Sequence, residues 1–181
     1  MTDDEKIEKI IDSLSTNALG DIQRASSGGS KMGAFILCSC LIDAISGFEK
    51  GSDTTKTDYI AFVGRRLGAY KGEDLYLDLR CKLVHSYSEG GSYLFVDNQN
   101  SLHGTLHNNK TLINLENFIS DIASALQAFA ADIRGADPTL RANALARLNS
   151  NRIIGISTQD VKVQIKDQNT STITRSLTGA D

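Results

Sequence analysis

The chain has 181 residues, of which 40% are hydrophobic and 23% are charged, and its formal net charge is −3. This length allows one domain with its own core, or one domain and a tail. The composition is that of an ordinary globular protein. The net charge excludes an overall electrostatic attraction to nucleic acid, so any contact with RNA would depend on local positive patches.

The first residues, MTDDEKIEKIIDSL, begin with acidic side chains, unlike a secretory signal sequence with its basic start and apolar centre. The longest apolar run, GAFILC, is far too short to span a bilayer. We therefore expect a cytoplasmic protein without a membrane span. The cysteines, Cys38, Cys40 and Cys81, lack CxxC spacing, and we expect reduced thiols rather than disulfides or a zinc knuckle.

Apolar residues at three- and four-residue spacings predict a first amphipathic helix between Ile7 and Ile22, which ends by the SSGGS stretch at 26–30. Residues 31–51 are apolar on most faces and predict the most buried helix, ending near Gly47 or Gly51.

Residues 57–70 predict a third helix, with a basic outer side. Residues 72–88 predict a fourth, because leucines recur every four residues and acidic residues occupy its first turn. Short β-rich pieces broken by DNQN in residues 92–110 predict a small hairpin or an irregular excursion.

A long apolar stripe in residues 115–134 predicts a further helix, for which Asn114 is a natural N-cap. Asp137 and Pro138 predict a capped restart for a short helix up to about residue 150. Beyond Arg152, the runs IIGIST and VKVQI are compatible with short strands, but DQNTSTITRSLTGAD is polar and has no core pattern. We expect a helical domain at 1–152 and a polar, partly disordered C-terminal tail at 153–181.

The predicted fold is all-α: an up-and-down bundle of about five helices with a small irregular or β-hairpin excursion after the fourth. The second, fourth and fifth long helices should supply its core. The residues expected to meet there are Leu37, Leu41, Leu79, Leu83, Ile119, Ile122 and Leu126.

The run LDLRCKLVHSY places Arg80 and His85 five residues apart near the end of the fourth helix. Here the chain resembles the HEPN family, whose hallmark is an arginine, four to six residues and a histidine near the end of a long helix. The resemblance covers roughly residues 5–135. The LVH run and Tyr87 follow the family pattern, whereas Cys81 stands where many members have asparagine.

The resemblance implies metal-independent RNA cleavage, in which a 2′-hydroxyl attacks its own neighbouring phosphodiester. His85 would serve as general acid or base and Arg80 as phosphate binder, with no cofactor and no metal. Five residues along an ideal helix correspond to about 140° of rotation. We therefore expect Arg80 and His85 to flank a groove without direct contact.

Residues 65–82 are locally basic and are accompanied by tyrosines, a combination that can grip a single-stranded phosphate backbone and stack bases. A solvated helix face with core-facing tyrosines is the competing interpretation. The candidate substrate-binding residues are Arg65, Arg66, Lys82 and Tyr87.

A purely structural interpretation also stays open for the motif. His85 would then end the helix and bond its last carbonyls, while Arg80 would pair with an acidic neighbour on another element, such as Asp78 or Glu73. Asp78, Cys81 and His85 form an incomplete metal or nucleophile set. More simply, Asp78 would pair with Lys82 along the helix and Cys81 would be buried.

The leading hypothesis is an HEPN-like RNA-processing or defence protein, such as a toxin of a toxin–antitoxin or phage-defence system. It would form a two-fold homodimer that joins two copies of Arg80 and His85 in one cleft, and an antitoxin-like protein is a possible partner. The alternative is a non-catalytic helical module that binds a nucleotide or a protein.

Overall fold

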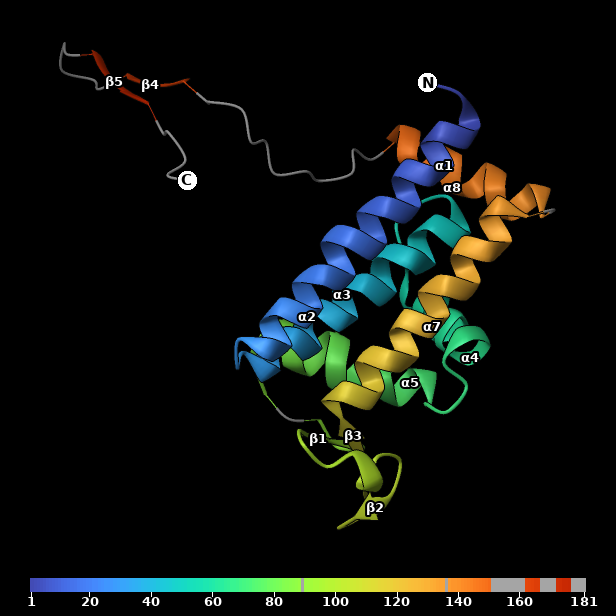
Figure 1. Ribbon diagram of the computed structural model, residues 1–181. Helices are drawn as coiled ribbons and strands as arrows, with labels where there is room; N and C mark the ends of the chain where they lie inside the picture. The colour runs from blue at the N-terminus through green and yellow to red at the C-terminus, as the bar shows by residue number, and fades with distance from the viewer. Residues whose placement is uncertain (89, 136, 151–161, 167–171, 177–181) are drawn as a thin grey trace.

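The computed structural model describes residues 1–88, 90–135, 137–150, 162–166 and 172–176. Within these residues the protein is mostly helical and has a small three-stranded sheet (Figure 1). The helices of the main body are α1 (Asp3–Asp12), α2 (Gly20–Ser27), α3 (Lys31–Lys50), α4 (Lys56–Arg66), α5 (Gly72–Leu75), α6 (Val84–Ser86), α7 (Leu115–Arg134) and α8 (Pro138–Ser150).

The first helix begins with a capping box, in which the Thr2 hydroxyl accepts from the Glu5 backbone and the Glu5 carboxylate accepts from the Thr2 backbone. It then runs without a break from α1 through a π-helical segment, η1 (Ser13–Leu19), into α2. The sequence pattern predicted this helix correctly, and the helix ends at Ser27, within the SSGGS stretch. The pattern did not predict the π-helical turn.

The apolar helix α3 is the central element, and it packs against α2, α4, α7 and α8. It ends where Gly51 adopts a left-handed conformation with φ of 86°, as the sequence predicted. By length and composition alone α3 could cross a membrane, and most of it is buried inside the protein.

The fourth predicted helix is continuous from α5 through a second π-helical segment, η2 (Tyr76–Leu83), into α6. It ends at Tyr87, whose φ of 49° places it in the left-handed region. The third predicted helix, α4, begins at a second capping box made by Thr55 and Asp58, and ends at Arg66, earlier than the pattern suggested.

The excursion after α6 is a three-stranded sheet that lies at one end of the helices (Figure 1). Its strands are β1 (Tyr93–Val96), β2 (Leu106–His107) and β3 (Lys110–Asn114), in the order β1-β3-β2. Strands β2 and β3 form a hairpin whose turn is at Asn108 and Asn109, both in left-handed conformations, and not at the DNQN stretch that broke the sequence pattern. Strand β1 pairs with β3 in parallel, which the sequence pattern did not predict.

The core lies between α3 and the helices around it. Leu79 and Leu83 are buried there, as predicted, whereas Leu37 and Ile119 are half-buried at its edge. The other expected core residues, Leu41, Ile122 and Leu126, are buried.

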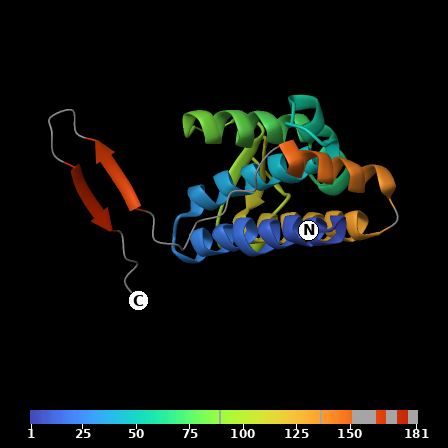
Figure 2. The same ribbon diagram turned by 90° about the horizontal axis from the view of Figure 1, so that it is seen from above.

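Helix α7 begins after Asn114, but the Asn114 side chain does not cap it; it bonds Gln99, Asn100 and Asn117 instead. Asp137 does cap α8, through the backbone N–H groups of Thr139 and Leu140. In Figure 2, α8 and the helix α5–α6 lie on the same side of α3.

Two further strands, β4 (Lys162–Lys166) and β5 (Thr172–Ser176), pair antiparallel. Strand β4 overlaps the VKVQI run that was compatible with a strand. The rest of the expected tail, including the IIGIST run at 153–158, lies outside the described residues.

Candidate functional site: an Asp–Arg–His chain on a π-helical turn

The candidate site is built on the π-helical segment η2, which contains Arg80. At the end of this segment the backbone N–H of Val84 donates to the carbonyl of Leu79, five residues earlier. In such a turn the backbone hydrogen bond joins residues five apart, so their side chains point closer to the same direction than the roughly 140° of an ideal α-helix allows. The local geometry therefore aligns Arg80 with His85.

The two side chains of the motif touch: Arg80 Nη1 lies 2.5 Å from His85 Nε2. The expectation of a groove without direct contact was wrong, because it assumed an ideal α-helix. The structural alternative, in which His85 bonds the last carbonyls of its helix, does not describe this geometry either. A guanidinium can only donate, so His85 Nε2 is the acceptor in this contact.

Asp43 of α3 holds the other side of Arg80, with its carboxylate accepting from Arg80 Nε. Both side chains are partly shielded from solvent, 25% exposed for Asp43 and 30% for Arg80. Burial raises the pKa of Asp43, while Arg80, Arg147 and His85 act in the opposite direction. The Asp43 carbonyl also accepts from the Thr54 hydroxyl at 2.7 Å. Asp43, Arg80 and His85 thus form a continuous polar chain.

The structural interpretation expected Arg80 to pair with an acidic neighbour, and it does, but the partner is Asp43 and not Asp78 or Glu73. Asp78 is buried and accepts from three backbone N–H groups of residues 91–93, at 2.7–3.0 Å. Glu73 pairs with Lys56 at 2.6 Å. The predicted pair of Asp78 with Lys82 is therefore wrong, and Asp78 instead ties the chain after the motif to the helix.

The four candidate substrate-binding residues separate into two groups. Lys82 and Tyr87 are exposed next to the motif, and the Tyr87 residue is 68% exposed. Arg65 and Arg66 instead bind the buried carboxylate of Glu49, and Arg66 also pairs with Asp132 at 2.6 Å. Since Glu49 is six residues beyond Asp43 on α3, the two side chains point about 120° apart around the helix. The structure does not bring Arg65 and Arg66 to Arg80.

Of the two thiols near the site, Cys40 is a poor nucleophile. Cys40 is exposed on α3, one turn before Asp43, and its pKa is raised by burial and by the Asp43 charge. Cys81 is half-buried rather than fully buried. Across the described part of the chain, no three His, Cys, Asp or Glu side chains are grouped so as to hold a metal ion.

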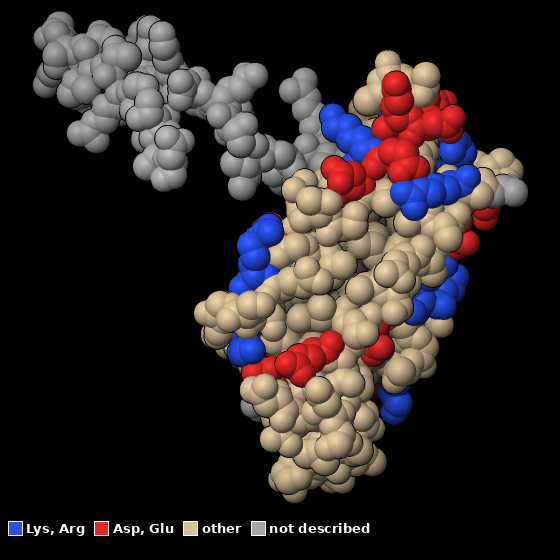
Figure 3. Space-filling view, in the orientation of Figure 1, with Lys and Arg blue, Asp and Glu red and all other residues tan. Residues whose placement is uncertain are grey.

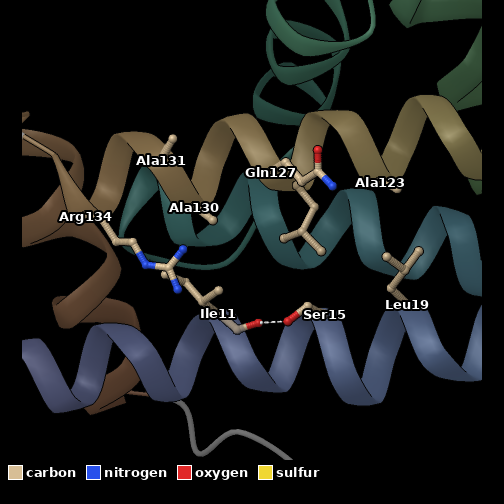
Figure 4. A pocket seen from close by; sticks show the side chains of 9 residues that line it. Ile11, Ser15, Leu19, Ala123, Gln127, Ala130, Ala131 and Arg134 are labelled. Carbon is tan, nitrogen blue, oxygen red and sulfur yellow. Dashed lines mark hydrogen bonds between the residues drawn. The ribbon is translucent and has the colours of Figure 1, made fainter.

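A cavity of about 300 Å³ lies on a different face, between α1–η1 and α7 (Figure 4). Alanines and leucines line most of it, with Ser15 and Gln127 as uncharged polar groups and Arg134 at one end. Figure 3 shows this face, with charged side chains at its margins and an uncharged, hollowed middle. Arg134 is held by Glu8, so the cavity offers no group that suits acid–base chemistry.

In comparisons of the chain with models of known families, with curated proteins and with solved structures, no match was found.

Proposed function

We propose that the protein is an HEPN-like, metal-independent endoribonuclease. The observation that supports this most strongly is the direct contact of Arg80 with His85, together with the Asp43 carboxylate behind the arginine. A histidine, an arginine and an orienting acid are suited to phosphodiester cleavage, which needs proton transfer and stabilisation of a negatively charged transition state.

In the proposed reaction, the ribose 2′-hydroxyl attacks the adjacent phosphorus, and the 5′-oxygen of the next nucleotide leaves. The products are a 2′,3′-cyclic phosphate and a 5′-hydroxyl end. When Arg80 turns its Nη1 donor to the phosphate, His85 Nε2 is freed to take up the 2′-hydroxyl proton, and a histidine in its protonated form delivers a proton to the leaving oxygen. Arg80 donates to the phosphate oxygens while Asp43 fixes the plane of its guanidinium. Lys82 and Tyr87, which are exposed beside the motif, would contact the strand next to this point.

A two-fold homodimer completes the proposal. The reaction needs one proton removed from the attacking hydroxyl and one delivered to the leaving oxygen, but each chain supplies only one histidine. A dimer would bring two histidines to the same site. We propose an up-and-down helical bundle, acting in the cytoplasm in RNA processing or in defence. An antitoxin-like protein would be its partner in a toxin–antitoxin or phage-defence system.

The second candidate function is a non-catalytic module that uses the same surface to bind a nucleotide or a protein. Cys81, at the position where many HEPN members have asparagine, favours it. In that case the chain of Asp43, Arg80 and His85 would hold a ligand without cleaving it.

The two functions are separated by incubating the purified protein with mixed RNA in the presence of a chelator. The proposal predicts fragments with 2′,3′-cyclic phosphate ends, which are lost in the His85→Ala and Arg80→Ala variants. Intact RNA at all protein concentrations, with wild-type protein that is folded, would exclude an autonomous nuclease and leave the binding module.

A further inference from the structure

We infer that Arg147 of α8 is a second phosphate-binding arginine, which contacts the RNA backbone beside the phosphate at Arg80. This inference rests on the proposed function. Arg147 lies outside the part of the chain that resembles the HEPN family, and no sequence pattern pointed to it.

The first observation is the way in which Arg147 is held. Its guanidinium lies directly against Gly47 of α3, in the space that a Cβ at that position would occupy. Nη1 donates to the Ser52 carbonyl and lies 3.2 Å from Asp53 Oδ1, and the Phe48 ring is 5.6 Å away. A glycine inside a helix costs stability relative to alanine. Here Gly47 leaves the space in which the Arg147 guanidinium packs in a fixed orientation, and this space is called the Arg147 seat below.

The second observation is the position of this seat. Gly47 follows Asp43 by four residues on α3, and residues four apart share one face of a helix, about 5–6 Å from each other. Arg80 approaches that face from η2 and Arg147 approaches it from α8. Two guanidinium groups therefore flank Asp43 within about one helical turn. The Arg147 charge reaches this carboxylate, because it is among the charges that oppose the rise in the Asp43 pKa.

The third observation concerns the donors of Arg147. The hydrogen bonds to other described residues all come from Nη1. The Nε–H and Nη2 donors have no such bond within the described residues, and 16% of the side-chain surface stays exposed. An oriented arginine with two neighbouring donors is suited to a phosphate oxygen pair. A strand whose reacting phosphate is at Arg80 would continue along the face of α3 past Arg147.

Binding of a labelled single-stranded RNA to the His85→Ala protein, followed by fluorescence anisotropy between 50 and 200 mM salt, tests this inference. Adding Arg147→Gln should weaken binding several-fold and reduce the slope of log K against log salt by about 0.7, the value for one phosphate contact on a single strand. Arg24→Gln, which removes an exposed arginine of α2, is the matched charge control and should leave both values unchanged.

Gly47→Ala is the second variant, because it keeps every charge and introduces a better helix former. Its Cβ would push the flexible guanidinium off its seat, so RNA binding should weaken while the melting midpoint is retained. Unchanged binding in both the Arg147→Gln and Gly47→Ala proteins would show that Arg147 only fastens α8 to α3. Failure of the His85→Ala parent to bind any RNA would overturn the proposed function together with this inference.

Discussion

Asp43 is the residue on which the orientation of Arg80 depends. Replacing it with asparagine retains an oxygen acceptor for Nε but removes the charge. If Asp43 positions Arg80 for catalysis, Asp43→Asn should slow RNA cleavage by about 10- to 100-fold, as expected for a misplaced catalytic group. Asp21→Asn, at an exposed ion pair on α2, should cleave like the wild type.

The pH profile distinguishes positioning by Asp43 from a merely structural role. Because burial raises the pKa of Asp43, this carboxylate takes up a proton at a higher pH than an ordinary aspartate and then no longer pairs with Arg80. Wild-type cleavage should therefore decline on the acid side through that protonation. The same decline in the Asp43→Asn protein would show that another group causes it.

Asp78 and Lys82 provide a second test at the scale of single residues. Asp78 is the acceptor for three backbone N–H groups, so Asp78→Ala should lower the free energy of unfolding by at least about 2 kcal/mol. Lys82 is exposed and does not pair with Asp78, so Lys82→Ala should change it by no more than about 0.5 kcal/mol. Urea unfolding measures both variants. An equal loss in the free energy of unfolding would indicate that Asp78 does pair with Lys82.

The sequence predicted the motif residues but not the residue that orients them. Arg80 and His85 are close in the chain and follow a recognisable spacing. Asp43 lies 37 residues before Arg80, on a helix whose other residues are mostly apolar. Only the packing of η2 on α3 brings it to the arginine, and nearby acidic residues such as Asp78 were the more obvious partners.

At the scale of elements, the π-helical turn η2 decides how the motif works. Apolar periodicity predicts helix, but over eight residues it does not separate an α-helical from a π-helical turn. The expected 140° between Arg80 and His85 was therefore wrong, although the helix itself was predicted correctly. Parallel pairing of β1 with β3 was missed for a related reason, since local patterns favour hairpins between neighbouring strands.

The packing of this same helix can be tested with two leucines. Leu83 is 4% exposed and Leu77 is 43% exposed. Leu83→Ala should lower the free energy of unfolding by about 2–5 kcal/mol, because it leaves a cavity in the core. Leu77→Ala should cost less than about 1 kcal/mol. Similar losses in chemical denaturation would mean that the helix presents a different face to α3.

At the scale of the whole molecule, composition and periodicity predicted a mostly helical chain with α3 at its centre. They did not predict that α8 would pack on α3 beside the motif helix, because that docking depends on particular residues. Gly47 and Gly51 leave room for Arg147 and Asn143, and the Asn143 amide donates to the Glu49 carbonyl at 2.8 Å.

The proposed dimer is the prediction that belongs to this scale. Light scattering at micromolar concentration should give twice the chain mass of 19.6 kDa. If the motif helices meet at the two-fold axis, Leu77→Glu should shift the mass toward a monomer. Leu106→Glu, at the exposed edge of β2, should not. A monomeric wild-type protein would contradict the proposed site that is shared by two copies of Arg80 and His85.

The most direct test of the central claim uses a DNA oligonucleotide that contains a single ribonucleotide. In chelator, the wild-type protein should cut only after that ribonucleotide and leave a 2′,3′-cyclic phosphate, because the 2′-hydroxyl is the nucleophile. The all-deoxy strand and the His85→Ala protein should give no product. Cleavage of the all-deoxy strand, or cleavage that persists in the His85→Ala protein, would contradict the account in which Arg80 and His85 carry out the reaction.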